Sequence, residues 1–102
     1  MNSSPIDTPS PRAFRVEVTN DTLAVQLLDG RTISVPLSWF PRLQQASGAE
    51  RTNWELIGNG EGIHWPALDE DVAVESLLEG RRSTESSGSF RRWVVSRRDR
   101  RL

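Results

Sequence analysis

The residues best suited to chemistry are an imidazole and three carboxylates within a short stretch: His64, Asp69, Glu70 and Asp71. One imidazole with carboxylates is a reasonable ligand set for zinc or manganese. The chain has a single histidine and no cysteine, however, so the usual zinc ligand sets cannot be built. Carboxylates also favour the positive end of a helix dipole. We therefore interpret the acidic triplet as a helix start, and we expect no bound metal and no cofactor.

His64 is also a candidate general base, because an unperturbed imidazole titrates near neutral pH. Catalysis would need a nucleophile or an orienting partner, and Ser38, Ser47 and Asp69 are arbitrary choices. No G-x-S-x-G, P-loop or paired-histidine motif occurs. The glycine-rich run over residues 58–62 lies between two strand patterns and reads as a turn, not a phosphate cradle. We predict that the protein is not an enzyme, and we assign no catalytic residue.

Tryptophans and an arginine near the middle of the chain are candidates for partner binding. Large aromatic side chains in a small domain usually lie in the core. Trp39 and Trp65 each lie next to a proline-bearing turn, however, and tryptophan is enriched among binding hot spots. We expect any apolar contact surface around these two residues and Arg42. The candidate partner-binding residues are Trp39, Arg42, Trp65, Asp69, Glu70 and Asp71.

Residues 81–102 form a second candidate region, with eight arginines against Glu85 and Asp99. Arginine can neutralise phosphate and tryptophan can stack on bases, so a nucleic-acid arm is one interpretation. Its candidate contacts are Arg91, Arg92, Trp93, Arg97 and Arg98. The tail could instead be solvated, add a strand to a sheet edge, or fold back on residues 50–79, whose net charge is −7. We favour a solvated or partner-ordered tail.

Alternating apolar residues predict a hairpin early in the chain. A two-residue Asp29-Gly30 loop would place core and solvent residues on the same face. A three-residue loop, Leu28-Asp29-Gly30, instead opposes Val25 to Ile33 and Leu23 to Val35. That loop type needs a left-handed glycine at its third position. We therefore predict one apolar face from these residues: Leu23, Val25, Leu27, Ile33 and Val35.

The middle of the chain alternates helical and strand patterns. Ser38 is a candidate N-cap for a helix that carries Leu43, and Ser47 and Glu50 have capping-box spacing. Residues 54–57 and 63–65 read as strands, and a last short helix ends at Gly80. The order β-β-β-α-β-β-α predicts an α+β fold: a small, mostly antiparallel sheet with helices packed on one face.

Composition sets the expected domain limits. A chain of 102 residues holds one domain. Proline and serine dominate residues 1–13, which predicts a disordered leader before a domain at 14–80 and an arginine-rich flexible tail at 81–102. The absence of cysteine, of an apolar signal region and of a membrane-length apolar run leads us to expect a cytoplasmic protein without a membrane partner.

Several motifs resemble a known prokaryotic family, Domain of Unknown Function 2442. They are L-x-V-x-L-x-D-G-R-x-I-x-V-P-L at residues 23–37, P-R-L at 41–43, E-R-x-N-W at 50–54, G-I-H-W-P-x-L-D-E-D at 62–71 and V-x-x-L-L-x-G at 74–80. The resemblance implies a small α+β domain, similar in some members to components of toxin–antitoxin-like gene pairs. Other members carry a helix-turn-helix domain after the module, and residues 81–102 are too short and polar to form one.

These observations lead to a functional expectation. We expect a non-enzymatic interaction module, one component of a toxin–antitoxin-like two-gene pair, whose partner is a small protein encoded by a neighbouring gene. The alternative is a nucleic-acid-binding or regulatory protein that uses the arginine-rich tail. The sequence leaves the oligomeric state open.

Overall fold

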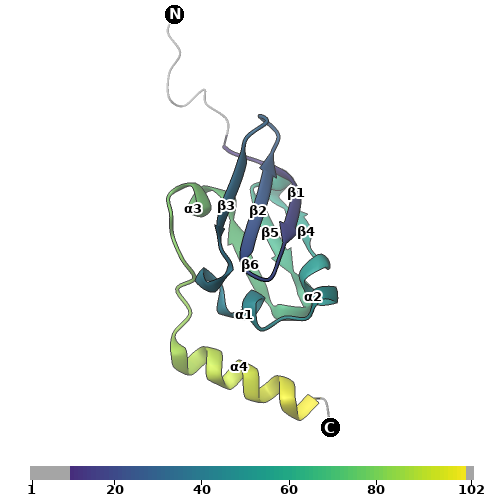
Figure 1. Ribbon diagram of the computed structural model, residues 1–102, viewed down its shortest axis with the longest axis vertical. Helices are drawn as coiled ribbons and strands as arrows, with labels where there is room; N and C mark the ends of the chain where they lie inside the picture. Colours follow the sequence, from purple (N-terminus) through teal and green to yellow (C-terminus); the bar gives the residue numbers. More distant parts are fainter. Residues whose placement is uncertain (1–9, 101–102) are drawn as a thin grey trace, which may run out of the picture.

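The computed structural model describes residues 10–100 and contains two antiparallel three-stranded sheets (Figure 1). The first sheet has the order β1-β2-β3 and the second has the order β4-β5-β6. The strands are β1 (Ala13–Val18), β2 (Thr22–Leu27), β3 (Thr32–Pro36), β4 (Glu55–Ile57), β5 (Gly62–Trp65) and β6 (Glu70–Ala73). The predicted α+β class is confirmed. The strands are divided between two sheets where we expected one.

The first hairpin has the predicted register. Leu23 pairs with Val35 and Val25 pairs with Ile33 across β2 and β3. The backbone N–H of Leu27 donates to the carbonyl of Arg31 at 2.8 Å, which closes a three-residue loop. Gly30 has a φ of 98°, the left-handed conformation that this loop type requires. The alternation of the strands thus determines the loop length.

Short helical segments surround the sheets. A 3-10 helix (Leu37–Trp39) precedes α1 (Pro41–Gln44), and α2 (Gly48–Thr52) and α3 (Val74–Leu78) follow later in the chain. Ser38 lies inside the 3-10 helix, so its predicted role as an N-cap is wrong; Pro41 occupies the first turn of α1 as expected. The predicted capping box is confirmed, because Ser47 Oγ accepts from the Glu50 backbone and the Glu50 carboxylate accepts from that of Ser47.

The acidic triplet does not start a helix. Asp69 has a left-handed φ of 52° and ends a 3-10 turn, and Glu70 and Asp71 lie in β6. Antiparallel pairing with β5 decides the conformation, since Trp65 pairs with Glu70 and Ile63 pairs with Val72. Burial of Val72 against Ile63 thus outweighs the preference of carboxylates for a helix start.

The core is a single cluster to which both sheets contribute. Trp65 is its largest fully buried side chain, and its indole N–H donates to the Arg51 carbonyl at 3.0 Å. The buried apolar residues are Ala13, Val16, Leu23, Val25, Leu27, Val35, Leu37, Phe40, Leu43, Ala46, Ile63, Trp65, Leu68, Val72, Val74 and Leu77. All of them precede Gly80, so the two sheets and their short helices build the core without the last helix.

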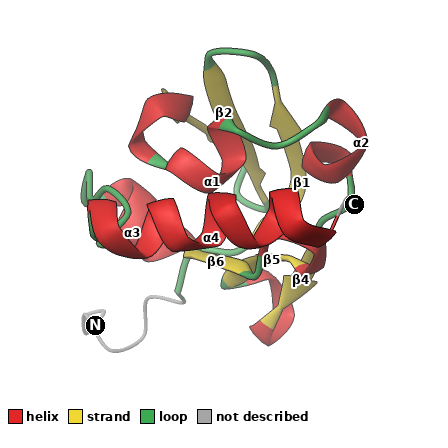
Figure 2. Cartoon of the chain, turned by 90° about the horizontal axis from the view of Figure 1, so that it is seen from below, coloured by secondary structure: helices red, strands yellow, loops and turns green. Residues whose placement is uncertain are grey.

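Residues near the end of the chain form helix α4 (Ser87–Arg100) where the sequence predicted a flexible tail. Figures 1 and 2 show α4 lying across one end of the molecule, beside α1. Most of the predicted leader, residues 1–9, lies outside the described residues, and Ala13 is already a buried residue of β1. No helix within residues 10–100 has both the length and the apolar character needed to cross a membrane.

Candidate functional site

Helix α4 is attached to the domain through an ion pair that begins on α1. The guanidinium of Arg42 donates to both carboxylate oxygens of Glu85, with the shortest contact at 2.6 Å. It also donates to the Leu68 carbonyl at 2.9 Å, which links α1 to the turn before β6. Ser89 Oγ, in the first turn of α4, donates to the same Glu85 carboxylate at 2.9 Å. Hydrogen bonds from Arg42 hold the pKa of Glu85 below its usual value, so this carboxylate is charged at neutral pH.

A tryptophan of α4 contacts two arginines. The Arg42 guanidinium carbon is 5.0 Å from the Trp93 ring centroid, and that of Arg97 is 4.6 Å away. Both distances are typical of cation–π contacts. Phe90, one turn earlier, stacks on Trp93 with ring centroids 5.8 Å apart. These residues form the inner side of α4, and Trp93 packs against the edge of the core.

A second ion pair fixes the other half of α4. Arg97 donates to Glu50 at 2.8 Å, and both side chains are largely shielded from water. Glu50 is also the capping-box carboxylate of α2. The hydrogen bond from Arg97 lowers the pKa of Glu50. Arg97 therefore connects α4 to residues 50–79, as the fold-back interpretation of the tail anticipated.

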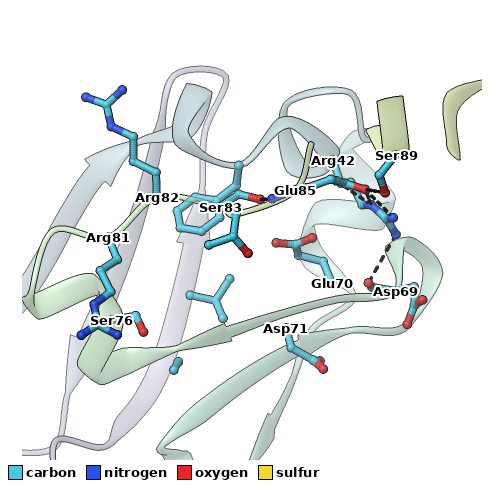
Figure 3. A pocket seen from close by; sticks show the side chains of 14 residues that line it. Arg42, Asp69, Glu70, Asp71, Ser76, Arg81, Arg82, Ser83, Glu85 and Ser89 are labelled. Carbon is cyan, nitrogen blue, oxygen red and sulfur yellow. Dashed lines mark hydrogen bonds and ion pairs between the residues drawn. The ribbon is translucent and has the colours of Figure 1, made fainter. Parts of the chain in front are cut away.

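A cleft of about 590 Å³ opens between β6, α1 and the segment that leads into α4 (Figure 3). The Glu70 carboxylate points into it, beside the Arg42–Glu85 pair. Burial raises the pKa of Glu70 to about 7, although the nearby Arg42 charge acts in the opposite direction. Arg42 is already bound to Glu85, which explains why it does not compensate Glu70 fully. Among the carboxylates of the cleft, Glu85 is therefore paired with Arg42, whereas Glu70 has a pKa raised to about 7 by burial.

The predicted partner-binding residues are partly brought together. Arg42, Asp69, Glu70 and Asp71 all line the cleft. Trp65 is fully buried in the core, so its assignment to a partner surface is wrong. Its position on the inward side of β5 outweighs the effect of the adjacent proline turn. Trp39 is half-buried, and the Arg82 guanidinium lies 5.0 Å from its ring centroid.

His64 contacts a carboxylate, but not in a metal-like cluster. Glu55, His64 and Asp71 form one cross-strand row on the second sheet, and His64 Nδ1 is paired with Asp71. The hydrogen bond with Asp71 raises the pKa of His64. Within residues 10–100, no three side chains of histidine, cysteine, aspartate or glutamate are arranged to hold a metal ion.

The predicted nucleic-acid contacts divide between the two sides of α4. Trp93 and Arg97 face the domain, whereas Arg91, Arg92 and Arg98 are exposed. None of these three exposed arginines forms an ion pair with another described residue. We call Arg91, Arg92, Val95 and Arg98 the outer face of α4.

Sequence reasoning missed the two carboxylates that anchor α4, Glu85 and Glu50. A sequence pattern for the helix was available. Phe90, Trp93, Val94 and Arg97 have i, i+3, i+4, i+7 spacing, and Ser86 Oγ accepts from the Ser89 backbone at 3.1 Å, as an N-cap would. The contacts of this helix with α1 and α2 join positions that are far apart in the chain, and no local sequence pattern encodes those contacts.

Comparisons with known proteins agree with this architecture. A crystal structure of a protein of unknown function from Rhodospirillum rubrum is 29% identical, has a TM-score of 0.64, and is matched over 76% of this chain and 95% of that one. A solution structure of the uncharacterised protein CV0863 from Chromobacterium violaceum is 23% identical, has a TM-score of 0.62, and is matched over 72% of this chain and 69% of that one; it supports the fold alone. No curated protein matches. The model of the family described as "Protein of unknown function (DUF2442)" matches residues 13–83, and the chain therefore belongs to that family.

Proposed function

We propose that the protein is a non-enzymatic interaction module that binds a protein partner through the outer face of α4. One observation carries the proposal: α4 is attached outside a complete core and carries three exposed arginines. A helix that contributed mainly to folding would bury an apolar stripe. The contacts of α4 and of the segment that enters it are instead two ion pairs and a tryptophan that contacts two arginines.

The outer face suits an acidic protein surface. Arg91 and Arg98 are seven residues apart and therefore share one side of the helix, about 10 Å from each other. Guanidinium groups bind carboxylates in a bidentate geometry. Val95, which is 48% exposed, adds an apolar contact between the charges. The combination of spaced guanidiniums and one apolar side chain favours a folded acidic partner.

We further propose that this partner is a small protein encoded by a neighbouring gene, as in a toxin–antitoxin-like pair. The support is the resemblance to the family, because some of its members are similar to components of such pairs. The cleft lined by Arg42, Asp69, Glu70 and Asp71 is a second candidate surface for the same partner.

Co-expression with the neighbouring gene product, followed by pull-down, tests the proposal. We expect wild-type protein to capture the partner and the triple variant R91Q/R92Q/R98Q to lose capture. The matched control R12Q/R15Q/R31Q removes the same charge from exposed arginines near the first sheet and should bind as wild type does. Absence of a complex with wild-type protein would refute the proposal, as would equal losses in both variants.

Nucleic acid is the second candidate, because the same exposed arginines could bind phosphates. Trp93 is stacked within the molecule, which leaves the arginines without the aromatic contact expected of a single-strand binder. Phosphate binding would weaken steeply between 50 and 200 mM salt, by about tenfold or more for three contacts, and would disappear in R91Q/R92Q/R98Q. Fluorescence anisotropy with labelled duplex DNA and RNA decides between this and the protein partner.

A further inference from the structure

The second sheet has an outward side on which charged and apolar residues are ordered in rows. Glu55, His64 and Asp71 lie opposite one another across β4, β5 and β6. The next outward row is Ile57, Gly62 and Ala73. Glu55, Ile57, Asp71 and Ala73 are all exposed. We call Glu55, Ile57, His64, Asp71 and Ala73 the outer face of the second sheet.

This sheet face is complementary to the outer face of α4 in charge. It presents two carboxylates at the ends of one row, beside the exposed side chain of Ile57. The outer face of α4 presents guanidiniums on both sides of exposed Val95. Residues 50–79, which contain the sheet, carry a net charge of −7, whereas residues 81–102 carry +6.

The two faces also match in spacing. Glu55 and Asp71 are separated by two inter-strand distances, about 9.6 Å. Arg91 and Arg98 are separated by seven helical residues, about 10.5 Å. A helix laid across the strands would therefore place Arg91 and Arg98 over the two carboxylates at once. Val95 would then lie beside Ile57 and Ala73.

The match cannot be made within one molecule. The Arg42–Glu85 and Arg97–Glu50 pairs fix the inner side of α4 on α1 and α2. The three exposed arginines form no ion pair with the described residues of their own domain. The match with the second sheet therefore requires another copy.

We infer that the outer face of α4 in one copy docks on the outer face of the second sheet in a second copy. The inference rests on the proposed function, since both use α4 as the recognition element. The contact is heterologous, so a dimer retains a free helix on one copy and a free sheet on the other, and assembly continues with concentration. Helix α4 is about 21 Å long and about 10 Å wide, so the contact buries less than the ~800 Å² per partner of a stable complex. The association is therefore weak and sensitive to salt, and a partner bound to α4 displaces it.

Sedimentation velocity over a range of concentrations tests the inference. In 50 mM NaCl, wild-type protein should form species larger than the monomer, and these should dissociate in 500 mM NaCl. The helix variant R91Q/R98Q and the sheet variant E55Q/D71N should each weaken self-association by about tenfold. The control R15Q/R31Q should behave as wild type does. All substituted residues are exposed, so each variant should retain its fold, and circular dichroism checks this.

Mixing the two variants gives the sharpest result. The sheet variant keeps a basic helix and the helix variant keeps an acidic sheet, so one intact contact can form between them. The mixture should contain a 1:1 dimer at concentrations at which each variant alone is monomeric. A monomeric mixture at those concentrations would overturn the inference, and so would self-association of R91Q/R98Q as strong as that of wild-type protein. Wild-type protein that stays monomeric but captures the neighbouring gene product refutes self-docking alone. Self-association without capture of that product refutes the proposed function alone.

Discussion

The guanidinium of Arg42 and the carboxylate of Glu85 lie 2.6 Å apart, although 43 positions separate them in the chain. Arg42 follows the first residue of α1, and Glu85 belongs to the segment that enters α4. Because the side chains are only 15% and 11% exposed, this pair is better shielded than the Arg81–Glu79 pair, at 69% and 44%. The attachment of α4 therefore depends on it.

Replacing Glu85 should loosen α4. E85Q leaves Arg42 without its charged partner, and we expect the free energy of helix docking to fall by about 2 kcal/mol. The exposed-pair control E79Q should change docking by less than about 0.5 kcal/mol. The Trp93 indole N–H resonance reports docking, because undocking removes the guanidinium above the ring. An unchanged resonance in E85Q would contradict this role of the pair.

Docking should also depend on pH in a defined direction. The pKa of Glu85 is lowered, chiefly by its hydrogen bond with Arg42, from an ordinary value of 4.5. A carboxyl group with a lowered pKa stabilises the docked state above its ordinary value and loses this contribution as the pH falls through the lowered pKa. The Trp93 resonance should therefore be constant above about pH 5 and move below it. E85Q should retain only the response of Glu50, whose pKa Arg97 also lowers.

The charge of Glu70 should destabilise the folded protein, whereas that of Glu85 stabilises the docked helix. Burial raises its pKa to about 7, so the folded protein holds a proton that the unfolded chain releases near pH 4.5. The free energy of unfolding should therefore decrease as the pH rises from about 4.5 to 7. In urea denaturation, E70Q should lose this decrease and be more stable than wild type at pH 8. The exposed control E75Q should follow wild type, and an E70Q profile parallel to wild type would show that Glu70 is not buried.

The two tryptophans Trp65 and Trp93 should differ sharply in their effect on folding. W65A removes the largest buried side chain of the core and should cost about 3–5 kcal/mol. W93A removes a residue that packs outside the complete core, so the free energy of unfolding of the two-sheet domain should change by less than about 1 kcal/mol. Thermal and urea denaturation give both values. Equal destabilisation would mean that α4 is part of the core.

Gly60 and Gly30 form a matched pair of left-handed glycines. A Cβ at Gly60, where φ is 95°, would lie 2.5 Å from the Ala13 carbonyl oxygen, whereas a Cβ at Gly30, where φ is 98°, would have no atom within 4 Å. G30A should cost only the left-handed strain, about 1–2 kcal/mol. G60A should cost about 3 kcal/mol or more, because β1 must also move. Similar urea midpoints for the two variants would contradict this packing of β1 against the Gly58–Gly62 turn.

Local rules predicted much of this fold. The parity of alternating residues defined the loop before Arg31, and the Ser47–Glu50 spacing defined the start of α2. Both depend on neighbours a few residues apart. The sequence did not predict β6, for the opposite reason. Val72 and Val74 alternate as in a strand, but the three carboxylates before them suggested a helix start. Pairing with β5, a tertiary effect, decided between the two.

The candidate site was less accessible from the sequence. Arg42 was recognised as a site residue, but its partners Glu85 and Trp93 are 43 and 51 positions away. The basic composition of residues 81–102 suggested a solvated tail, since only Phe90, Trp93 and the adjacent valines indicate a helix with an inner side. The position of the docked helix is needed to tell the arginine that is bound to the domain, Arg97, from the exposed arginines, Arg91, Arg92 and Arg98.

Amide hydrogen exchange along α4 tests the central claim most directly, since that claim is a helix docked outside a complete domain. In wild-type protein, the amides of residues 90–97 should be protected, though less than those of β2. In W93A, protection should disappear from α4 and remain in both sheets. Exchange of residues 90–97 at unprotected rates in wild-type protein, unchanged by W93A, would contradict the account.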